Sequence, residues 1–321
     1  MLRTTGLTKT FGGLTAVDDV DFELAADELC SLIGPNGAGK TTFFNLLTGA
    51  LEPTEGTIEF RGGAGSEGAS ADGAGAYRDV TAAAPHETAS MGIHRSYQIT
   101  NVFPTSSVFE NVRIAAQAHG DDATTFWRNV SRYDEYEREA RAILERVGLT
   151  EHADAPASSL SHGEKRQLEV GIALAGDPDV LLLDEPNAGV SSESVGDIID
   201  LIEDVATDHA VLLVEHNMDI VMNVSDRVVV LNQGELIADG PPAAVRGDET
   251  VQRAYLGGYE SRSRHAEGDA SADDGEPPDG DREPADGDGA ATDGDDEAAT
   301  DADDEATTDG DDGSETAEGS A

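Results

Sequence analysis

Positive charge is scarce in this sequence. It holds 20 lysine and arginine residues against 66 aspartate and glutamate residues, a formal net charge of −46, and its only lysines are Lys9, Lys40 and Lys165. Nucleic-acid backbones and anionic lipid surfaces both attract clustered Lys and Arg. We therefore expect no nucleic-acid partner and no basic membrane patch. The acidic excess fits adaptation to a salt-rich cytoplasm, where ions screen repulsion, or a general role in solubility.

Cysteine and long apolar runs are also missing. Cys30 is the single cysteine, so the chain forms no intramolecular disulfide and no cysteine-based metal site. Its place in the apolar run 29–33 predicts a small buried thiol. No run approaches the roughly 20 apolar residues that span a bilayer, and no signal segment is visible. We expect a cytoplasmic chain that reaches a membrane only through partners.

Large apolar residues nearly disappear after residue 258. Residues 259–321 contain 24 acidic and 3 basic residues, with Gly, Ala, Ser, Thr and Pro making up most of the rest. Such a composition cannot offset the entropy of an ordered chain. We predict a disordered acidic tail over 259–321 and one folded domain over 1–258. The Gly/Ala/Ser/Asp-rich stretch 62–76 predicts an exposed loop insertion.

Between these segments, short apolar runs alternate with helical spacing. Strands are predicted at 28–33, 56–60, 179–183, 209–214 and 227–231, and helices at 40–48, 107–118, 133–147 and from 161 to about 175. Nearly continuous apolar strands are covered on both faces of a sheet, and alternation with helices indicates parallel pairing. The fold class predicted is α/β with a largely parallel sheet.

A phosphate-binding pattern lies between the first apolar strand and the first helix. Its residues, which fit G-x-x-x-x-G-K-[ST], are Gly34, Pro35, Asn36, Gly37, Ala38, Gly39, Lys40 and Thr41. The glycines let backbone amides cradle phosphate oxygens at a helix N-terminus, where the helix dipole is positive. Lys40 would reach the β- and γ-phosphates, and the Thr41 hydroxyl would ligate Mg²⁺. A chance Gly-rich turn is the alternative.

Two further patterns carry chemistry. The apolar run 180–183 ends in Asp184 and Glu185; beside a phosphate loop, the first is placed to hold the metal and the second to polarise an attacking water. Two solvated acids after a strand are the alternative. Ser161, followed three residues later by Glu164, predicts a capping box that begins a helix. That helix is either ordinary or presents its N-terminus to a phosphate.

The order of these motifs, together with Gln98 and His216, resembles the ATPase subunits of ABC transporters over nearly all of residues 1–258. Within that class the chain is similar to branched-chain amino acid importer ATPases at 11–17, 103–112, 168–170, 214–219, 232–234 and 254–257. The resemblance implies a P-loop NTPase fold with a mostly parallel core sheet, an antiparallel β subdomain and an α-helical subdomain at about 99–165. The helical segment is also the expected docking site for a membrane subunit.

The resemblance implies roles for individual residues. Glu185, His216 and Gln98 would be catalytic, and Thr41, Gln98 and Asp184 would hold Mg²⁺. ATP would be bound by the phosphate loop with Thr42, by Asp184, by Phe11 stacking on adenine, by Val17, and by a group that serves the opposite subunit's nucleotide: Ser161, His162, Gly163 and Glu164. A core role is the alternative for Phe11, and an ordinary solvated position the alternative for Gln98.

The implied assembly is a homodimer, or a heterodimer with a second ATPase subunit, with two transmembrane permease subunits and an extracytoplasmic solute-binding protein. The chain would lie on the inner face of the cell membrane. Departures from the family pattern are His162, Glu164, Asn187 and Ser191, which bear on how the two nucleotide sites communicate. Open alternatives are a urea or short-amide importer ATPase, a soluble assembly ATPase, a lipid exporter subunit and a phosphotransferase.

Overall fold

The computed structural model describes residues 1–62, 76–96, 102–119, 130–191 and 194–255. The chain divides into two units, Met1–Ser271 and Ala272–Ala321, and every described residue belongs to the first. The predicted tail at 259–321 lies outside the described residues, as does nearly all of the predicted insertion at 62–76. Both therefore stay predictions.

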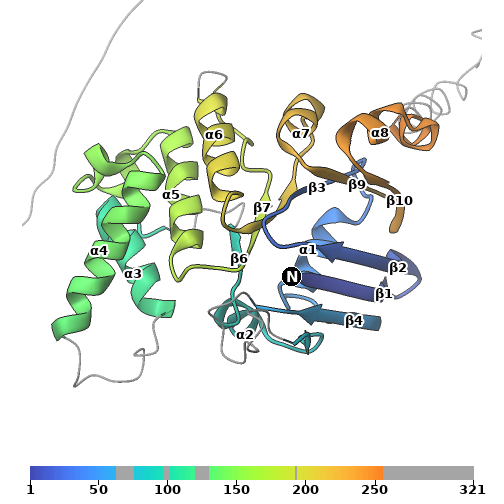
Figure 1. Cartoon of the computed structure of the whole chain (residues 1–321), viewed down its shortest axis with the longest axis horizontal. Coiled ribbons are helices and arrows are strands. Elements are labelled where there is room, and N and C mark those ends of the chain that lie inside the picture. Colours follow the sequence, from blue (N-terminus) through green and yellow to red (C-terminus); the bar gives the residue numbers. More distant parts are fainter. Residues whose placement is uncertain (63–75, 97–101, 120–129, 192–193, 256–321) are drawn as a thin grey trace, which may run out of the picture. The chain divides into compact units, whose positions relative to one another are not determined.

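Two sheets organise the described chain (Figure 1). The larger contains, in spatial order, β10 (Glu235–Gly240), β9 (Arg227–Asn232), β3 (Leu29–Ile33), β8 (Ala210–Val214), β7 (Val180–Asp184) and β6 (Ile93–Ser96). All of its neighbouring pairs are parallel except β9 with β10. The smaller contains β2 (Leu14–Leu24), β1 (Leu2–Phe11), β4 (Glu55–Phe60) and β5 (Arg78–Asp79), and its pairs are antiparallel. The predicted fold class, with a mostly parallel core sheet and an antiparallel β subdomain, is confirmed.

The helices of the described residues cover these sheets. They are α1 (Lys40–Leu47), α2 (Pro85–Ser90), α3 (Val108–His119), α4 (Val130–Arg146), α5 (His162–Leu174), α6 (Val195–Val205), α7 (Met218–Val224) and α8 (Pro242–Gly247), with short 3₁₀ turns at Thr150–His152 and Ala157–Ser159. Figure 1 shows α3, α4 and α5 gathered side by side. The first two fall inside the predicted helical subdomain at 99–165. No described helix combines the length and apolar character needed to cross a membrane.

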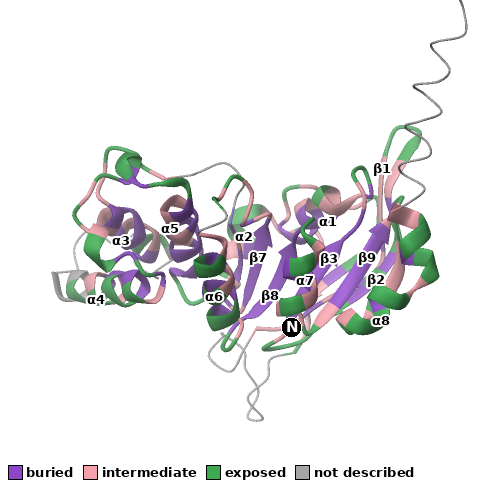
Figure 2. Cartoon of the chain, turned by 90° about the horizontal axis from the view of Figure 1, so that it is seen from above, coloured by how far each residue is buried: buried purple, intermediate pink, exposed green. Residues whose placement is uncertain are grey.

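The central strands separate two apolar cores. Every residue of β3, β7 and β8 is buried, and Figure 2 shows these strands beneath helices with exposed outer faces. In β7, Leu181 and Leu183 pack with the helical side, whereas Val180 and Leu182 pack with α1 and the antiparallel sheet. Because side chains alternate across a strand, one continuous apolar run supplies both cores. Cys30 is fully buried, as predicted.

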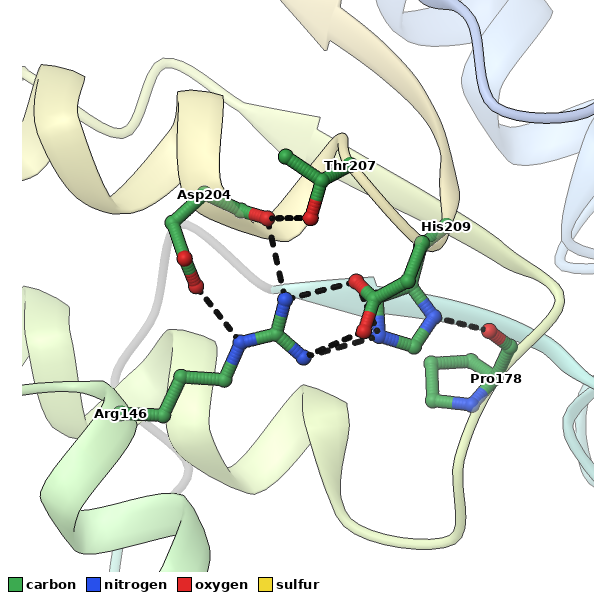
Figure 3. A network of polar contacts seen from close by, with 6 residues as sticks. Arg146, Pro178, Asp204, Thr207 and His209 are labelled. Carbon is green, nitrogen blue, oxygen red and sulfur yellow. Dashed lines mark hydrogen bonds and ion pairs between the residues drawn. The ribbon is translucent and has the colours of Figure 1, made fainter.

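A polar network joins the end of α4 to α6 and the start of β8 (Figure 3). Arg146 donates to Asp204 Oδ2 at 2.7 Å and to the two carboxylate oxygens of Asp208 at 2.6 and 3.1 Å. His209 donates from Nδ1 to the Pro178 carbonyl at 2.7 Å, and its Nε2 lies 3.3 Å from an Arg146 nitrogen and 3.3 Å from Asp208 Oδ1. The network fastens the helical segment to the parallel-sheet core.

Candidate functional site

The phosphate-binding pattern lies where β3 ends and α1 begins, packed tightly against two other strands. Gly39, with φ +106°, precedes α1, and a Cβ on it would lie 2.2 Å from the Ala16 carbonyl oxygen of β2. A Cβ on Gly34 would lie 2.1 Å from the Leu231 carbonyl oxygen of β9. Glycine is required at both positions because any side chain would collide with backbone. The loop is therefore fixed between the two sheets.

Lys40 reaches back over this loop. Its Nζ donates to the carbonyl of Gly34 at 2.6 Å and to that of Pro35 at 3.2 Å. Burial lowers the pKa of the Lys40 ammonium, and the nearby carboxylates of Glu185 and Asp184 oppose that effect. The sequence predictions are thus brought together here: a lysine, the amide end of a helix and two acids from the carboxyl end of β7.

Asp184 ends β7 in a buried position with an arginine that sequence reasoning missed. Its Oδ2 accepts from Arg95 of β6 at 2.7 Å, and both side chains are about one-tenth exposed. Arg95 also donates to Asn45 Oδ1 of α1 at 2.7 Å. This arginine therefore joins the strand that carries Asp184 to the helix that follows the phosphate loop.

Glu185 adopts a left-handed backbone with φ +48°, which is costly for a residue with a side chain. Three hydrogen bonds hold it there: its N–H donates to Val214 O at 2.9 Å, and its carbonyl accepts from Ala188 N and from Arg166 Nη2, both at 3.0 Å. Arg166 is a buried residue of α5, paired with Glu169 at 2.6 Å. The turn directs the chain out of the sheet immediately after the strand, and the Glu185 side chain is about one-third exposed.

His216 follows β8, and Glu185 follows the neighbouring strand β7. The two residues therefore lie at the same edge of the sheet. His216 Nδ1 lies 3.9 Å from Glu185 Oε1, and the His216 side chain is two-thirds exposed. The residue before it, Glu215, is almost completely buried and accepts a hydrogen bond from the His216 backbone N–H at 3.2 Å. Sequence reasoning found His216 and missed Glu215, although its adjacency to His216 was a signal.

The capping box predicted at the start of α5 is confirmed. Glu164 N–H donates to Ser161 Oγ at 3.3 Å, and Ser161 N–H donates to Glu164 Oε2 at 2.7 Å. The hydrogen bond from the Ser161 backbone N–H, with a further contribution from the Ser161 side chain, lowers the pKa of Glu164, whose carboxylate also contacts His152 Nε2 at 3.0 Å. His162 is exposed. Gly163 is buried and closely packed, because a Cβ there would lie 3.0 Å from Ser194 Cβ and would require Ser194 to shift.

The remaining predicted positions vary in exposure. Phe11 is 46% exposed at the end of β1, with Lys9 Nζ 5.3 Å from its ring centre, so the core alternative for this residue is wrong. Val17 is fully buried in the core. Within the loop and α1, Asn36, Gly37 and Thr41 are exposed, Pro35 and Thr42 are half-buried, and Ala38 is buried. Gln98 lies outside the described residues.

Known protein families match along most of this chain. The family "ABC transporter" matches residues 17–188, and the family "Branched-chain amino acid ATP-binding cassette transporter" matches residues 235–261. A solved ATP-binding cassette of an ABC transporter in its ADP conformation shares 30% identity with a TM-score of 0.67, covering 80% of this chain and 98% of that chain. A nucleotide-free cassette shares 29% identity with a TM-score of 0.66.

Related proteins match this chain over nearly their whole length. The high-affinity branched-chain amino acid transport ATP-binding protein LivG of Salmonella typhimurium is 38% identical over 266 residues, covering 80% of this chain and 98% of the relative. The corresponding protein BraF of Pseudomonas aeruginosa is 36% identical with the same coverage. A probable LivG from Archaeoglobus fulgidus is 32% identical, covering 81% and 97%. The chain belongs to the ABC transporter family, as an ATP-binding and ATP-hydrolysing subunit.

Proposed function

We propose that this subunit powers the uptake of branched-chain or other hydrophobic amino acids through separate membrane subunits. The observation that carries the solute class is the family match at 235–261, a segment remote in sequence from the phosphate loop. It is supported by relatives described as branched-chain amino acid transport proteins, which are matched over 97–98% of their length. An ATPase subunit does not need to touch the solute, so the inference rests on kinship with these relatives.

ATP binding is assigned to the phosphate loop and α1. The triphosphate would lie over the loop amides, and Lys40 Nζ would exchange its bonds to the Gly34 and Pro35 carbonyls for phosphate oxygens. Phe11, already exposed at the tip of β1, would offer its ring to the adenine. The fixed glycine contacts mean that little rearrangement of the loop is required.

Mg²⁺ fits the oxygen ligands at this place. The Thr41 hydroxyl at the start of α1 and the Asp184 carboxylate at the end of β7 are hard donors of the type that this cation prefers. When bound, the ion would neutralise charge on the β- and γ-phosphates. Arg95 holds one Asp184 oxygen at 2.7 Å and so fixes the direction of the carboxylate. Gln98, the other ligand inferred from the sequence, lies outside the described residues.

Hydrolysis is assigned to the two residues at the sheet edge. The partly exposed Glu185 carboxylate would orient and polarise the attacking water, and His216 would contact the γ-phosphate. Gln98 would complete the group. The strained backbone of Glu185 is held by a hydrogen bond that it donates to β8 and by two that its carbonyl accepts from α5 and from its own turn, which orients the base in advance of substrate binding.

A second ATPase subunit would complete each site. The N-terminus of α5, with Ser161, His162, Gly163 and Glu164, would close on the nucleotide of the opposite subunit, either a second copy of this chain or a second ABC ATPase subunit. Two permease subunits would hold the pair at the inner face of the cell membrane, and a solute-binding protein would deliver the amino acid. The relatives, described as transport ATP-binding proteins, support this assembly.

The solute assignment is tested in the organism that makes this chain. We would delete its gene, restore it as wild type, Lys40→Ala or Glu203→Gln, and measure uptake of labelled leucine, isoleucine, valine and urea. Glu203 is an exposed acid on α6 and serves as the control. The expected result is that amino acid uptake is lost on deletion and with Lys40→Ala and returns with the other two.

The outcomes separate the alternatives. Loss of urea uptake with intact amino acid uptake would reassign the solute and keep the importer. Uptake of every solute unchanged by deletion would contradict the importer proposal. ATP turnover by the purified chain is measured separately. If turnover is present while uptake is unaffected by deletion, the chain is a soluble assembly ATPase, and the proteins that copurify with it would identify the assembly.

A further inference from the structure

Glu215 stands out as a buried carboxylate at the edge of the sheet where Glu185 and His216 lie. Its side chain is 1% exposed, and three N–H groups donate to it. Oε1 accepts from the Asn187 backbone N–H and from Asn187 Nδ2, both at 3.1 Å, and Oε2 accepts from the His216 backbone N–H at 3.2 Å. Burying a carboxylate is costly unless it is hydrogen-bonded, and these bonds all go to the two loops beside the proposed chemistry.

The hydrogen bonds of Glu215 lie where the backbone hydrogen-bond ladder between β7 and β8 ends. Strands β7 and β8 pair as far as Asp184 with Val214, and Glu185 N–H continues the pairing by donating to Val214 O. The left-handed backbone of Glu185 then turns the chain away from the strand direction, so the backbone ladder ends there. The Glu215 carboxylate then supplies the acceptor for Asn187 N–H. A side chain thus continues the connection between the two strand ends where the backbone cannot.

Asn187 directs both of its donor groups at the same carboxylate oxygen. Its backbone N–H and its Nδ2 each donate to Glu215 Oε1 at 3.1 Å. A carboxylate only accepts hydrogen bonds, so Nδ2 is the amide atom that faces it. Asn187 and Glu215 are therefore complementary as donor and acceptor.

We propose that Glu215 is a positioning residue that joins the Glu185 loop to the His216 loop, so that the base and the γ-phosphate contact are held as one unit. This inference rests on the roles proposed for Glu185 and His216. Asn187 is its partner on the β7 side. Glu215 touches neither nucleotide nor water in this scheme.

The first test is a separation of turnover from binding in the full-length chain. Glu215→Gln keeps the size of the side chain but replaces one acceptor oxygen with a donor. We expect kcat for ATP hydrolysis to fall at least about tenfold, since small misplacement of a catalytic group is costly, while the Kd of a fluorescent ATP analogue changes less than about threefold, because the phosphate loop is untouched. Thr4→Val is the control: it removes two buried hydrogen bonds in the antiparallel sheet, and its kcat should match the parent.

A swap of the pair is the sharper test. Asn187→Asp places two carboxylates against each other and should lower kcat more than Asn187→Ala does. Adding Glu215→Gln to Asn187→Asp supplies an amide donor opposite the new acid, and we expect kcat to recover at least about threefold over Asn187→Asp alone. A purely structural role would predict that kcat falls and recovers only in step with the midpoint of unfolding in every variant.

The following results would overturn the positioning role of Glu215 or the roles on which it rests. Parental kcat in a folded Glu215→Gln variant, no recovery in the swapped pair, or an equal loss of kcat in Thr4→Val would overturn the positioning role. If Glu215→Gln does not fold, Asn187→Ala and the swapped pair still carry the test, because Asn187→Ala leaves the carboxylate in place. Glu185→Gln and His216→Ala are measured alongside. Normal turnover in those two would refute their proposed roles, whereas their failure with normal Glu215→Gln turnover would refute only this inference.

Discussion

At the phosphate loop, a single ammonium group is poised between main-chain carbonyls and two carboxylates. We expect Lys40→Ala to raise the Kd for ATP about 100-fold, because the charge-assisted bonds to the β- and γ-phosphates are lost. Titration with a fluorescent ATP analogue measures this. Arg3→Ala, which removes one positive charge from β1 where Arg3 pairs with Glu59, should bind like the parent. Equal weakening in both variants would mean that overall charge, and not Lys40, sets the affinity.

Substitution of Glu185 should affect ATP turnover without affecting ATP binding. Glu185→Gln removes the anionic base but preserves the turn that Val214 and Arg166 hold, so we expect ATP binding to persist while kcat falls about 100- to 1,000-fold. An ATP-bound dimer should accumulate, which light scattering detects. The exposed Glu203→Gln substitution on α6 serves as the matched control. A variant that turns over normally would remove Glu185 from the mechanism.

Some of these residues were readable in the sequence and others were not. Lys40, Asp184 and Ser161 stand in local patterns whose spacing encodes a loop, a strand end and a helix cap. Arg95, Arg166 and Glu215 act on partners 89, 19 and 28 residues away. Such pairs form only once the strands are adjacent, and no local spacing encodes them. The paired fold had to be known before their contacts could be named.

Among the elements, α4 is attached to the parallel-sheet core by polar bonds from Arg146 in addition to its buried apolar side chains. Arg146→Ala should lower the free energy of unfolding by about 1–2 kcal/mol, since several charge-assisted bonds from a side chain only 27% exposed are lost. Arg146→Lys should recover part of this loss, because it keeps the charge but not the planar fork. Urea denaturation measures both. No change in either variant would show that apolar packing alone fastens the helix.

The same network predicts how stability depends on acidity. Burial alone would raise the pKa of Asp208, but the hydrogen bond from Arg146, the nearby charges of His209 and Arg146, and a backbone hydrogen bond together outweigh it, and the pKa lies below the ordinary value of 3.8. A depressed pKa in the folded state means a contribution that is present above the unfolded pKa and lost as the pH falls through the folded one. Asp208→Asn should therefore melt below the parent at pH 7, and the gap should narrow as the pH falls below 3.8 and through the lower folded-state pKa. A gap independent of pH would contradict this.

Elements differ in how well their sequence reveals them. Strands β3, β7 and β8 were predicted from unbroken apolar runs, which follow from burial on both faces. The hairpin of β1 and β2 carries register shifts near Leu7 and Lys9, and its burial does not alternate evenly. Bulges break the two-residue period that a strand prediction needs. Only the family resemblance indicated an antiparallel subdomain there.

For the whole molecule, the curated relatives set the extent of the working part. About 80% of this chain accounts for 98% of LivG from Salmonella typhimurium, and the second family match ends at residue 261. We therefore expect deletion of residues 262–321 to leave kcat and the Kd for ATP within about twofold of the full chain. The comparison is made at several KCl concentrations, because the deleted segment carries much of the net charge. A large fall in kcat or a large rise in Kd at every KCl concentration would show that the segment contributes to ATP binding or hydrolysis.

The single cysteine has a practical consequence. Cys30 is enclosed in β3, and burial raises the pKa of its thiol to about 12, so almost no thiolate is available to attack a maleimide at neutral pH. Cys30 therefore reacts little with the label, and introduced cysteines can be labelled without first replacing it. One introduced cysteine on the surface of α4 and another near α8 would carry a donor and an acceptor dye, and the distance between them could be followed through each cycle of ATP.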